Sequence, residues 1–467
     1  MTGPLFLGID LGTSSLKCGL FDEAGSCLRA ESVFYPTREW EGGAEQHCGD
    51  WWSALVAAVR RAATGIDPAL VVAIGIGGHA PSPVFVDADL EPVCPVLPWF
   101  DSRTKPQHDR LLEILGGRSE NGDERLMGQV AARAMWLRSA DPSAFARTAC
   151  ILHSGDYLVA RLTGQRVLTS SRAPNVFSAA DLPLCLIPPR ECRTGETVGR
   201  IAPEVARELQ LGSVTSVVSC GLDSFLGSVG SGVQRPGDAC LNTGSSAVVS
   251  LLTEADCAGR FKFAGCQLLS RPISPGGRAV WRFMQTAGLV DAPGDVLKKA
   301  ADIPPSASIL RHLPDLVQRT PLDESALHAT LSALRQRRSP VEAVRLLLDT
   351  ILLRERLVLE EFERACEPAR RVRLAGGLVR FDVFTQLQCD ILGRTVEIPK
   401  IPDSGTLGAA VMAAASVAQC PPEEAAARMV RIERAVCPRA SVADVYTTIF
   451  DEIRADAGLV NAPALQS

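Results

Sequence analysis

Short apolar runs joined by glycine and polar turns dominate the start of the chain. Residues 5–10, 16–21 and 27–34 are rich in Leu, Ile, Phe and Val, and each run has the length of a strand. Turns of Gly, Thr, Ser, Asp and Glu join them, which predicts a meander of three antiparallel strands. A helix capped by an Asp is expected at 51–63, followed at 71–76 by a continuous apolar run. Such a run is typical of a strand that is covered on both faces.

The order of meander, helix and strand narrows the fold class. It differs from the β-α-β-α-β order of dinucleotide-binding folds. No Gly-x-x-x-x-Gly-Lys-Ser/Thr occurs, which excludes a Walker-type phosphate loop. Further strands are expected at 83–86 and 93–99, and helices at 130–138 and 154–162. Residues 166–200 are rich in Pro and Arg, which indicates an irregular active-site loop or a lid.

The first turn combines one carboxylate with freed backbone amides. Asp10 stands just before the run Gly12, Thr13 and Ser14. Backbone N–H groups of a Gly-rich turn form a concave anion site, and a carboxylate beside it can hold Mg²⁺ directly or through water. This combination suits a nucleotide polyphosphate. The same residues also occur in ordinary hairpins, so the turn alone leaves both interpretations open.

A second turn of the same kind lies about half of the 467 residues later. Residues 242–246 read Asn-Thr-Gly-Ser-Ser between two apolar runs, as residues 10–14 read Asp-Leu-Gly-Thr-Ser. The chain is too long for one ordinary core, and two domains are expected at 1–235 and 236–467. One phosphate turn in each domain, facing across a cleft, would explain the repeat. Chance similarity of short Gly/Ser turns is the alternative.

The second half of the chain shows clear helix and loop signals. A capping box with Pro at the first helical position starts a long helix at 340–365. A strand at 372–374 then leads into Gly376 and Gly377, where no side chain would keep a flat ring or a phosphate from the backbone. The uncharged, Ala-rich segment 405–420 falls short of the roughly 20 residues of a membrane span. It predicts a buried helix that lies close to another backbone.

Two segments of the first half carry candidate chemistry. Asp223 follows a strand predicted at 213–220, where an Asp is often simply a helix N-cap. Trp99 and Asp101 stand within five residues of each other together with an Arg, a cluster that often contacts a polyhydroxy ligand. A surface salt bridge beside a core Trp is the equally weighted alternative for this cluster.

Composition and charge exclude several classes of protein. The chain is 46% hydrophobic and 22% charged, as globular proteins are, and its net charge of −5 argues against a nucleic-acid partner. Its 15 Cys and six His form neither Cys-x-x-Cys nor His-x-x-x-His, so a structural zinc or iron–sulfur site is not expected. With no signal peptide and no membrane span, the thiols indicate a reducing, cytoplasmic location.

Taken together, these motifs resemble the FGGY family of carbohydrate kinases, in the actin-like ATPase superfamily, and are most similar to its xylulokinase-like branch. The resemblance runs from residue 5 to about residue 416. Seven motifs carry it in the family's order: 8–14, 99–103, 156–164, 221–223, 242–246, 375–377 and 405–410. Each motif is weak alone, and their common order and spacing make the match specific.

The resemblance implies an α/β protein of two actin-like (ribonuclease H-like) ATPase domains with a central cleft. The expected activity is ATP-dependent phosphorylation of a ketose or polyol, most of all a xylulose-like sugar, with the sugar and catalytic base in 1–235 and ATP in 236–467. The implied roles are metal ligand for Asp10, general base for Asp223, sugar contacts for His79, Trp99, Asp101 and Asp223, phosphate contacts for Gly12, Thr13, Ser14, Gly244 and Ser245, and adenosine contacts for Gly376 and Gly377.

The chain also departs from the family pattern. Residues 79–82 read His-Ala-Pro-Ser where Gln-Met-His-Gly is usual, and the Arg-Glu pair typical of glycerol kinases is missing, which disfavours glycerol. His79 is open to a sugar contact or to a structural role in its loop. At 318–321 the family's Gly-Glu-Arg is reduced to Gln-Arg-Thr-Pro. A catalytically weak sugar- or nucleotide-binding homologue, acting as a sensor or partner protein, is therefore the alternative, and a homodimer is left open.

Overall fold

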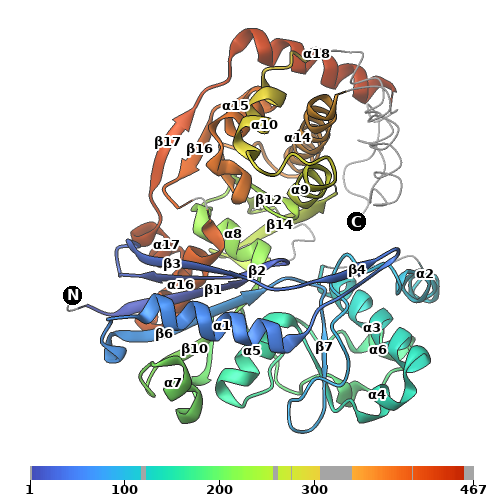
Figure 1. Cartoon of the computed structure of the whole chain (residues 1–467), viewed down its shortest axis with the longest axis vertical. Coiled ribbons are helices and arrows are strands. Elements are labelled where there is room, and N and C mark those ends of the chain that lie inside the picture. Colours follow the sequence, from blue (N-terminus) through green and yellow to red (C-terminus); the bar gives the residue numbers. More distant parts are fainter. Residues whose placement is uncertain are drawn as a thin grey trace.

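Two mixed β-sheets, one from each half of the chain, organise the computed structural model, which describes residues 3–116, 122–255, 261–274, 276–305, 339–401 and 403–456. In spatial order the first sheet contains β3 (Cys27–Phe34), β2 (Ser15–Phe21), β1 (Leu5–Leu11), β6 (Val71–Gly78), β10 (Ser216–Leu222) and β9 (Glu196–Arg200). The second contains β13 (Phe261–Phe263), β14 (Cys266–Ile273), β12 (Ala247–Thr253), β11 (Asp238–Thr243), β15 (Arg371–Ala375), β16 (Val396–Pro399) and β17 (Ile432–Val436). Helices lie on both faces of each sheet, which confirms the α/β class (Figure 1).

The two sheets repeat one topology. β1 pairs antiparallel with β2 and parallel with β6, and β11 pairs antiparallel with β12 and parallel with β15. A third antiparallel strand, β3 or β14, completes each meander. On the other side a second parallel strand, β10 or β16, is followed by an antiparallel strand, β9 or β17. This duplication explains why similar turns occur in both halves of the sequence.

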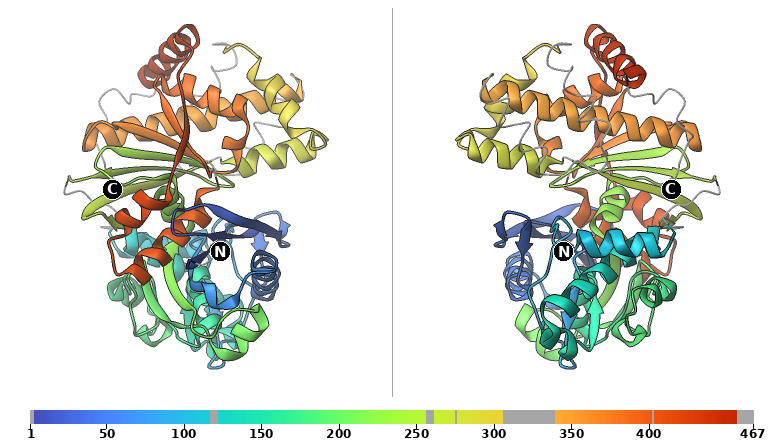
Figure 2. Two further views of the ribbon diagram at one scale, coloured as in Figure 1. Left: turned by 90° about the vertical axis from the view of Figure 1, so that its left-hand side faces the viewer. Right: turned by 90° about the vertical axis from the view of Figure 1, so that its right-hand side faces the viewer.

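The helices form three layers, and the two sheets share the middle one. The outer face of the first sheet packs against α1 (Cys48–Ala63), α5 (Ser154–Thr163) and α7 (Pro203–Leu209). Between the sheets lie α8 (Asp223–Ser231), α16 (Ser404–Ala418) and α17 (Pro422–Met429). The outer face of the second sheet carries α9 (Gly277–Thr286), α10 (Pro293–Ala301), α14 (Pro340–Ala365), α15 (Asp382–Leu392) and α18 (Ala440–Asp456). The side views in Figure 2 show α14 stretched along that sheet.

Alternating side chains of β1 explain the layering. Leu7 and Ile9 belong to the cluster under α1, whereas Phe6 belongs to the cluster around α16. Successive side chains of a strand point to opposite faces, so a strand that is apolar at every position needs cover on both. All seven residues of β1 are buried.

α16 approaches the first sheet at backbone contact distance. A Cβ at Gly8 would lie 1.8 Å from the carbonyl oxygen of Thr406, and one at Gly75 would lie 2.0 Å from that of Ala409. No side chain fits at either position, so glycine on the strands and alanine on the helix permit this packing. The prediction of a buried helix that contacts another backbone through small residues is confirmed.

A smaller set of elements surrounds the outer end of the first sheet. β4 (Arg38–Trp40) and β5 (Gly43–Glu45) form a short hairpin, and β7 (Val84–Val86) pairs antiparallel with β8 (Cys150–Leu152), which follows much later in the chain. The helices are α2 (Lys105–Ile114), α3 (Gly122–Ala140), α4 (Pro142–Arg147) and α6 (Pro174–Ala179), with 3₁₀ turns η1 (Pro68–Leu70) and η2 (Leu184–Leu186). The boundary predicted at 235/236 falls between α8 and β11.

Most of the predicted elements are present, including the capping box of Ser339 and Glu342 at the start of α14. The strand predicted at 93–99 is wrong, since no described strand spans those residues. Pro92, Pro95 and Pro98 have no N–H to donate to a ladder, and Val96 makes an isolated bridge with Gln46. The altered motif at 318–321 lies outside the described residues.

None of the helices in the described ranges is long and apolar enough to cross a membrane.

Candidate active site

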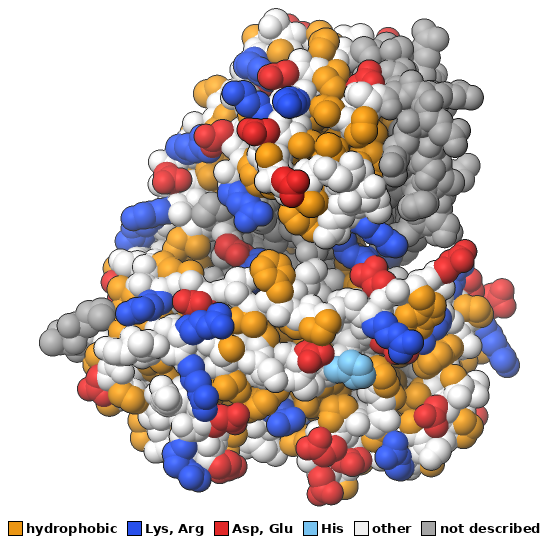
Figure 3. Space-filling view, viewed as in Figure 1, with side chains coloured by type: hydrophobic (Ala, Val, Ile, Leu, Met, Phe, Trp, Pro, Cys, Tyr) orange, Lys and Arg blue, Asp and Glu red, His pale blue; other side chains and the backbone are white. Residues whose placement is uncertain are grey.

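A polar cleft lies where the two repeated turns face each other, and it is open to solvent. The first half contributes the turn after β1 and the start of α8, and the second half contributes the turn after β11, the glycines after β15 and the start of α16. Among the predicted residues the cleft is lined by Asp10, Gly12, Thr13, Asp223, Gly244, Ser245, Gly376 and Gly377. In Figure 3 the molecule is narrower where the two halves meet.

Asp10 is a buried acid of the cleft. It is 7% exposed, and no described residue hydrogen-bonds its Oδ1. Burial raises the pKa of its carboxyl from 3.8 to about 7, and the negative charges of Asp223 and Asp403 add to this rise while Lys17 opposes it. A buried carboxylate without a hydrogen-bond donor is costly unless a cation approaches.

Lys17 supplies the positive charge on this side of the cleft. It stands directly opposite Asp10 in the β1–β2 ladder, and its Nζ lies 2.7 Å from Oδ1 of Asp403 at the start of α16. Burial tends to lower the pKa of Lys17, but Asp403, Asp10 and Asp223 outweigh burial and raise it. The ammonium is therefore charged at neutral pH and partly balances three carboxylates.

Asp223 lies at the junction of β10 and α8, at the edge of the first sheet. Leu222 is the N-cap of α8 and Gly221 has φ of +72°, so Asp223 is the first residue of the helix rather than its cap. Its Oδ1 accepts a hydrogen bond of 2.6 Å from the backbone N–H of Ser224. The helix N-terminus favours the ionised form of this carboxylate. A proton acceptor is thus presented to the cleft beside Asp10.

The second turn rests on a buried acid. Oγ1 of Thr243 donates a 2.6 Å hydrogen bond to Oε1 of Glu355 on α14, and Gln388 donates to the other oxygen. Burial raises the pKa of Glu355 to about 7. The backbone N–H groups of Gly277 and Arg278 bond to the carbonyl oxygens of Gly244 (3.1 Å) and Ser245 (3.0 Å). Gly244 and Ser245 are thereby fixed from two sides.

The two glycines after β15 differ from each other. Gly376 has φ of +100°, and a Cβ there would lie 2.5 Å from the carbonyl carbon of Thr243. At Gly377 a Cβ would meet no described atom within 4 Å. The first glycine is required by the backbone, whereas the second leaves an open surface on which a flat ring can lie.

Of the predicted sugar contacts Asp223 lines the cleft, whereas His79, Trp99 and Asp101 do not. Trp99 is nearest, because its Nε1 donates a 2.9 Å hydrogen bond to Oγ1 of Thr13. Asp101 accepts from the backbone N–H of Ala44 and from Nε of Arg103, at 2.8 and 2.9 Å. Ser14, predicted as a phosphate contact, is exposed and also lies outside the cleft lining.

His79 is buried under α1. It is 1% exposed, its ring meets Trp51 edge-on at 5.4 Å, and its Nδ1 lies 2.7 Å from Oγ of Ser82. Burial lowers the pKa of the imidazole to about 3, so the ring is neutral at pH 7. No hydrogen-bond partner of Nε2 is found among the described residues.

Sequence reasoning missed Lys17, Asn242 and Asp403 as cleft residues, although all three line it. Lys17 could have been found from the predicted hairpin. With a turn at 12–15, the residue opposite Asp10 is Lys17, and residues directly opposite in an antiparallel pair share a face. Asp403 gave no such signal, because its contact with Lys17 joins segments 386 positions apart.

A metal would depend on few protein ligands here. Among the described residues no group of three or more His, Cys, Asp or Glu could hold an ion. Mg²⁺ typically keeps several waters and takes one or two carboxylates together with substrate phosphates. The unpartnered Oδ1 of Asp10, beside two phosphate-type turns, fits that mode of binding.

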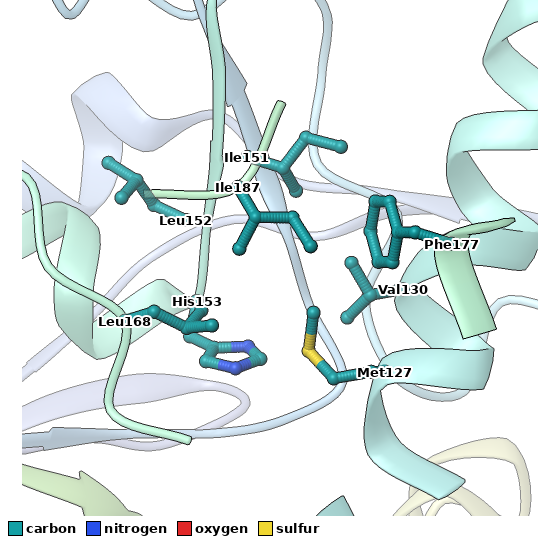
Figure 4. Close-up of a pocket in the computed structure, with 8 residues that line it drawn as sticks. All are labelled: Met127, Val130, Ile151, Leu152, His153, Leu168, Phe177 and Ile187. Atoms are coloured by element: carbon teal, nitrogen blue, oxygen red, sulfur yellow. The ribbon is translucent and has the colours of Figure 1, made fainter. Parts of the chain in front are cut away.

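A second crevice is apolar and belongs to the core. Figure 4 shows Met127 beside the His153 ring, with Phe177 and Val130 facing Ile151 and Ile187. The crevice leaves no room for a water molecule. Most of its lining residues belong to the hydrophobic cluster around α3 and α6, so it is packing space and not a ligand site.

The duplicated sheet topology and the paired turns define a two-domain α/β protein with an actin-like ATPase fold. The model of the FGGY family of carbohydrate kinases, N-terminal domain, matches residues 5–230, and that of the C-terminal domain matches residues 283–417. The chain therefore belongs to the FGGY family of carbohydrate kinases, and it is a sugar kinase by class.

Individual relatives agree with this assignment. A xylulose kinase of Bacillus subtilis is 25% identical over 479 residues, covering 95% of each chain. The solved structure of a ligand-bound xylulose kinase from Lactobacillus acidophilus matches with a TM-score of 0.79 at 18% identity, covering 99% of both chains. A gluconate kinase from the same species matches with a TM-score of 0.78, also at 18% identity and 99% coverage. The two structures share the fold of this chain.

Proposed function

We propose that this protein transfers the γ-phosphoryl group of Mg-ATP to a hydroxyl group of a ketose or polyol, with a xylulose-like sugar as the leading substrate. The observation that carries the proposal is the cleft in which two phosphate-type turns face each other beside Asp10 and Asp223. Phosphoryl transfer depends on positioning and charge stabilisation more than on covalent help from the protein. The cleft offers both.

The two turns would hold one triphosphate from opposite sides. From the first half Thr13 would contribute its N–H group and hydroxyl, while the N–H of Gly12 already donates to the carbonyl oxygen of Ser15 at 3.1 Å. Gly244 and Ser245 would contribute N–H groups and a hydroxyl from the second half. Amides and hydroxyls aimed at developing negative charge stabilise it without reorganising. The open surface at Gly377 would take the adenine ring, since no described side chain covers it.

Asp10 would hold Mg²⁺ through its buried, unpartnered Oδ1 and through bound water. When bound, the cation neutralises charge on the β- and γ-phosphates. The raised pKa of Asp10 describes the protein without a cation, and a nearby divalent charge favours the ionised carboxylate. Lys17, on the same face, would offset the charge of Asp403 rather than contact phosphate.

Asp223 would act as the general base. A sugar hydroxyl attacks the γ-phosphorus, its oxygen forms the new P–O bond, and the bond to the β-phosphate oxygen breaks. The hydroxyl proton passes to the carboxylate of Asp223. Asp223 then releases this proton to solvent after ADP and the sugar phosphate leave. The position of Asp223 at the start of α8, on the sheet edge that faces the cleft, supports this role.

The substrate class rests on similarity and on the chemistry beside the first turn. The 25% identical relative is a xylulose kinase, and Trp99 is bonded to Thr13, where a sugar carbon face could stack. The loop 79–82 departs from the family pattern, and its His79 is buried against Trp51. A ketose or polyol of pentose size is therefore proposed with the individual sugar left to experiment.

The test is ATP consumption over a panel of ketoses, aldoses, polyols and sugar acids. Asp223→Asn should lower kcat on the best substrate by about 10²–10⁴-fold. The matched control is Asp181→Asn, the same chemical change at a side chain that is 99% exposed, and it should leave kcat unchanged. Unchanged turnover in Asp223→Asn would remove the assigned base. Thermal stabilisation by a sugar or ADP, without turnover of any panel member, would favour a non-catalytic sensor instead.

A further inference from the structure

A direct side-chain contact joins the two halves at the rim of the cleft. Nη2 of Arg278, on α9 of the second half, lies 2.6 Å from Oε1 of Glu39 on β4 of the first half. The guanidinium of Arg278 also lies over the ring of Phe100, with Cζ 3.7 Å from the ring centroid. The Arg278 side chain is 15% exposed and that of Glu39 is 34% exposed, so the pair is partly shielded from water.

We propose that Arg278 is a positioning residue that holds the second phosphate turn over the first by pairing with Glu39 and Phe100, so that the cleft keeps its closed arrangement. The inference rests on the proposed function, because it assigns Arg278 a part in the same transfer reaction. None of the described contacts of Arg278 is with Asp10 or Asp223, and it would act through the turns that it joins.

On the second half, Arg278 is fastened to the phosphate turn itself. Its backbone N–H donates to the carbonyl oxygen of Ser245 at 3.0 Å, and that of Gly277 donates to Gly244 at 3.1 Å. A Cβ at Gly277 would lie 2.4 Å from the oxygen of Gly244, so the start of α9 sits directly on the turn. Movement of the Arg278 side chain relative to Glu39 therefore implies movement of this turn.

On the first half, Phe100 is linked to the other phosphate turn. Its ring meets the ring of Trp99 edge-on at 5.3 Å, and Nε1 of Trp99 donates to Oγ1 of Thr13. A continuous set of contacts thus runs from Ser245 through Arg278, Phe100 and Trp99 to Thr13. Packed side chains with hydrogen bonds can couple two sites in this way.

The strand that carries Glu39 is braced from below by Asp101 and Arg103. Asp101 accepts from the N–H of Ala44, and Arg103 pairs with Glu45 at 3.0 Å and stacks over Trp40 at 4.8 Å. These contacts fix the β4–β5 hairpin to the loop that contains Phe100. They give the acid and base of the 99–103 motif a structural task at the rim.

The position of the contact suits a link that holds the two halves together at one edge of the cleft. We call the contacts of Arg278 with Glu39 and Phe100 the clasp. α8 and α16 join the halves through the layer between the sheets, and Figure 1 shows β4 beneath α9 at the right of the view, away from α17. Figure 3 shows basic side chains facing acidic ones across the narrow gap over these elements. An ion pair that is partly exposed is weak, which permits reopening for product release.

Arg282 provides a matched control on the same helix. Its Nη1 lies 3.6 Å from the other oxygen of Glu39, and its side chain is 53% exposed. It shares the charge and the partner of Arg278. The stacking on Phe100 and the backbone bond to the phosphate turn belong to Arg278. Loss of Arg282 should therefore matter much less.

The test compares Arg278→Ala, Arg282→Ala, Arg278→Glu, Glu39→Arg and the charge-reversed double variant. Arg278→Ala should raise KM for ATP about tenfold and increase the radius of gyration of the ligand-free protein in small-angle X-ray scattering. Arg282→Ala should stay within about twofold of the wild type. Each single reversal should open the molecule, and the double reversal should restore most of the compactness and KM.

Scattering separates failure of this inference from failure of the kinase assignment. If no sugar is phosphorylated but Arg278→Ala and Glu39→Arg expand the protein, the clasp stands and the proposed function falls. If the wild type is active while Arg278→Ala and Glu39→Arg keep its radius of gyration and its KM for ATP, the clasp is overturned. A double reversal that is no better than either single variant also overturns it.

Discussion

The two phosphate turns join equivalent strands but differ in length and in charge. Four residues separate the paired Leu11 and Leu16 in the first turn, and three separate Thr243 and Ala247 in the second. In the first, Asp10 stands opposite Lys17, and in the second the equivalent ladder positions hold Asn242 and Val248. Duplicated strands thus carry a charged pair on one side of the cleft and a neutral pair on the other. We infer that the first turn binds the metal and that the second contacts phosphate alone.

The supports of the two turns differ in the same sense. Thr13 of the first receives hydrogen bonds from Trp99 and from Nε2 of Gln46, both neutral donors. Thr243 of the second donates to Glu355, a carboxyl buried outside the cleft. The two turns therefore differ in the groups that support them, although both connect the first two strands of a meander.

Among variants of the two turns, the largest effect is expected from removing the charge of the first turn. Asp10→Asn keeps the size of the side chain but removes the anionic metal ligand, and should lower kcat/KM by about 10²–10³-fold. Steady-state kinetics at saturating Mg²⁺ measure this. A loss below about tenfold would mean that the first turn does not carry the metal chemistry.

Adding a charge to the second turn should weaken ATP binding moderately. Asn242→Asp places a carboxylate beside phosphate in the neutral half of the cleft, and we expect about a tenfold rise in KM for ATP with a smaller change in kcat. The rise should shrink as salt is added, because screening weakens repulsion between partly exposed charges. If Asn242→Asp lowered kcat as much as it lowers the affinity for ATP, the second turn would do more than bind phosphate, and the inferred role would be contradicted.

A smaller effect is expected at the open glycine. Gly377→Ala should leave the melting temperature unchanged, because no described atom lies within 4 Å of the added methyl group. It should weaken ADP binding several-fold if adenine lies on that backbone. Thermal melting and calorimetry on one preparation measure both quantities. Gly376→Ala is the contrasting variant, and should melt earlier because of its φ of +100°.

The smallest effect is a pH dependence of stability without ligand. Burial raises the folded-state pKa of Asp10 to about 7, above the ordinary 3.8, so its protonated form favours folding. This contribution is full below pH 3.8 and is lost as pH rises through 7. The Asn side chain does not ionise, so Asp10→Asn does not lose this stability as pH rises. Its melting temperature should exceed that of the wild type at pH 8, and the difference between the two melting temperatures should shrink toward pH 4. A difference independent of pH would contradict the shift.

Much of the fold follows from local sequence signals. The meander, the helix after it and the buried Ala-rich helix were predicted because apolar period and small residues act within short windows. The Asp cap predicted for the first helix is wrong, since α1 begins at Cys48 with His47 as its N-cap and Asp50 lies inside its first turn. The strand at 93–99 was wrongly predicted, because the apolar pattern outweighed Pro95 and Pro98, which cannot donate to a ladder. The shared middle layer was not predicted at all, since it depends on contacts between distant segments.

The cleft residues divide in the same way. Asp10, Asp223 and the glycines of both turns were predicted from motifs, and the structure gathers them in one cleft. His79, Trp99 and Asp101 were predicted as contacts of the sugar rather than of phosphate, and they do not line this cleft; Asp101 pairs with Arg103. Asp403 escaped notice, because only the packing of α16 against the first sheet brings it to Lys17.

The most direct measurement is the affinity of a non-hydrolysable ATP analogue with and without Mg²⁺, in the wild type, Asp10→Asn and Thr243→Val. Mg²⁺ should tighten binding in the wild type, and Asp10→Asn should lose most of that gain. Thr243→Val, which removes the hydrogen bond to Glu355, should weaken binding equally with and without the metal. A full Mg²⁺ gain in Asp10→Asn, or a loss of it in Thr243→Val, would contradict the division of labour between the two turns.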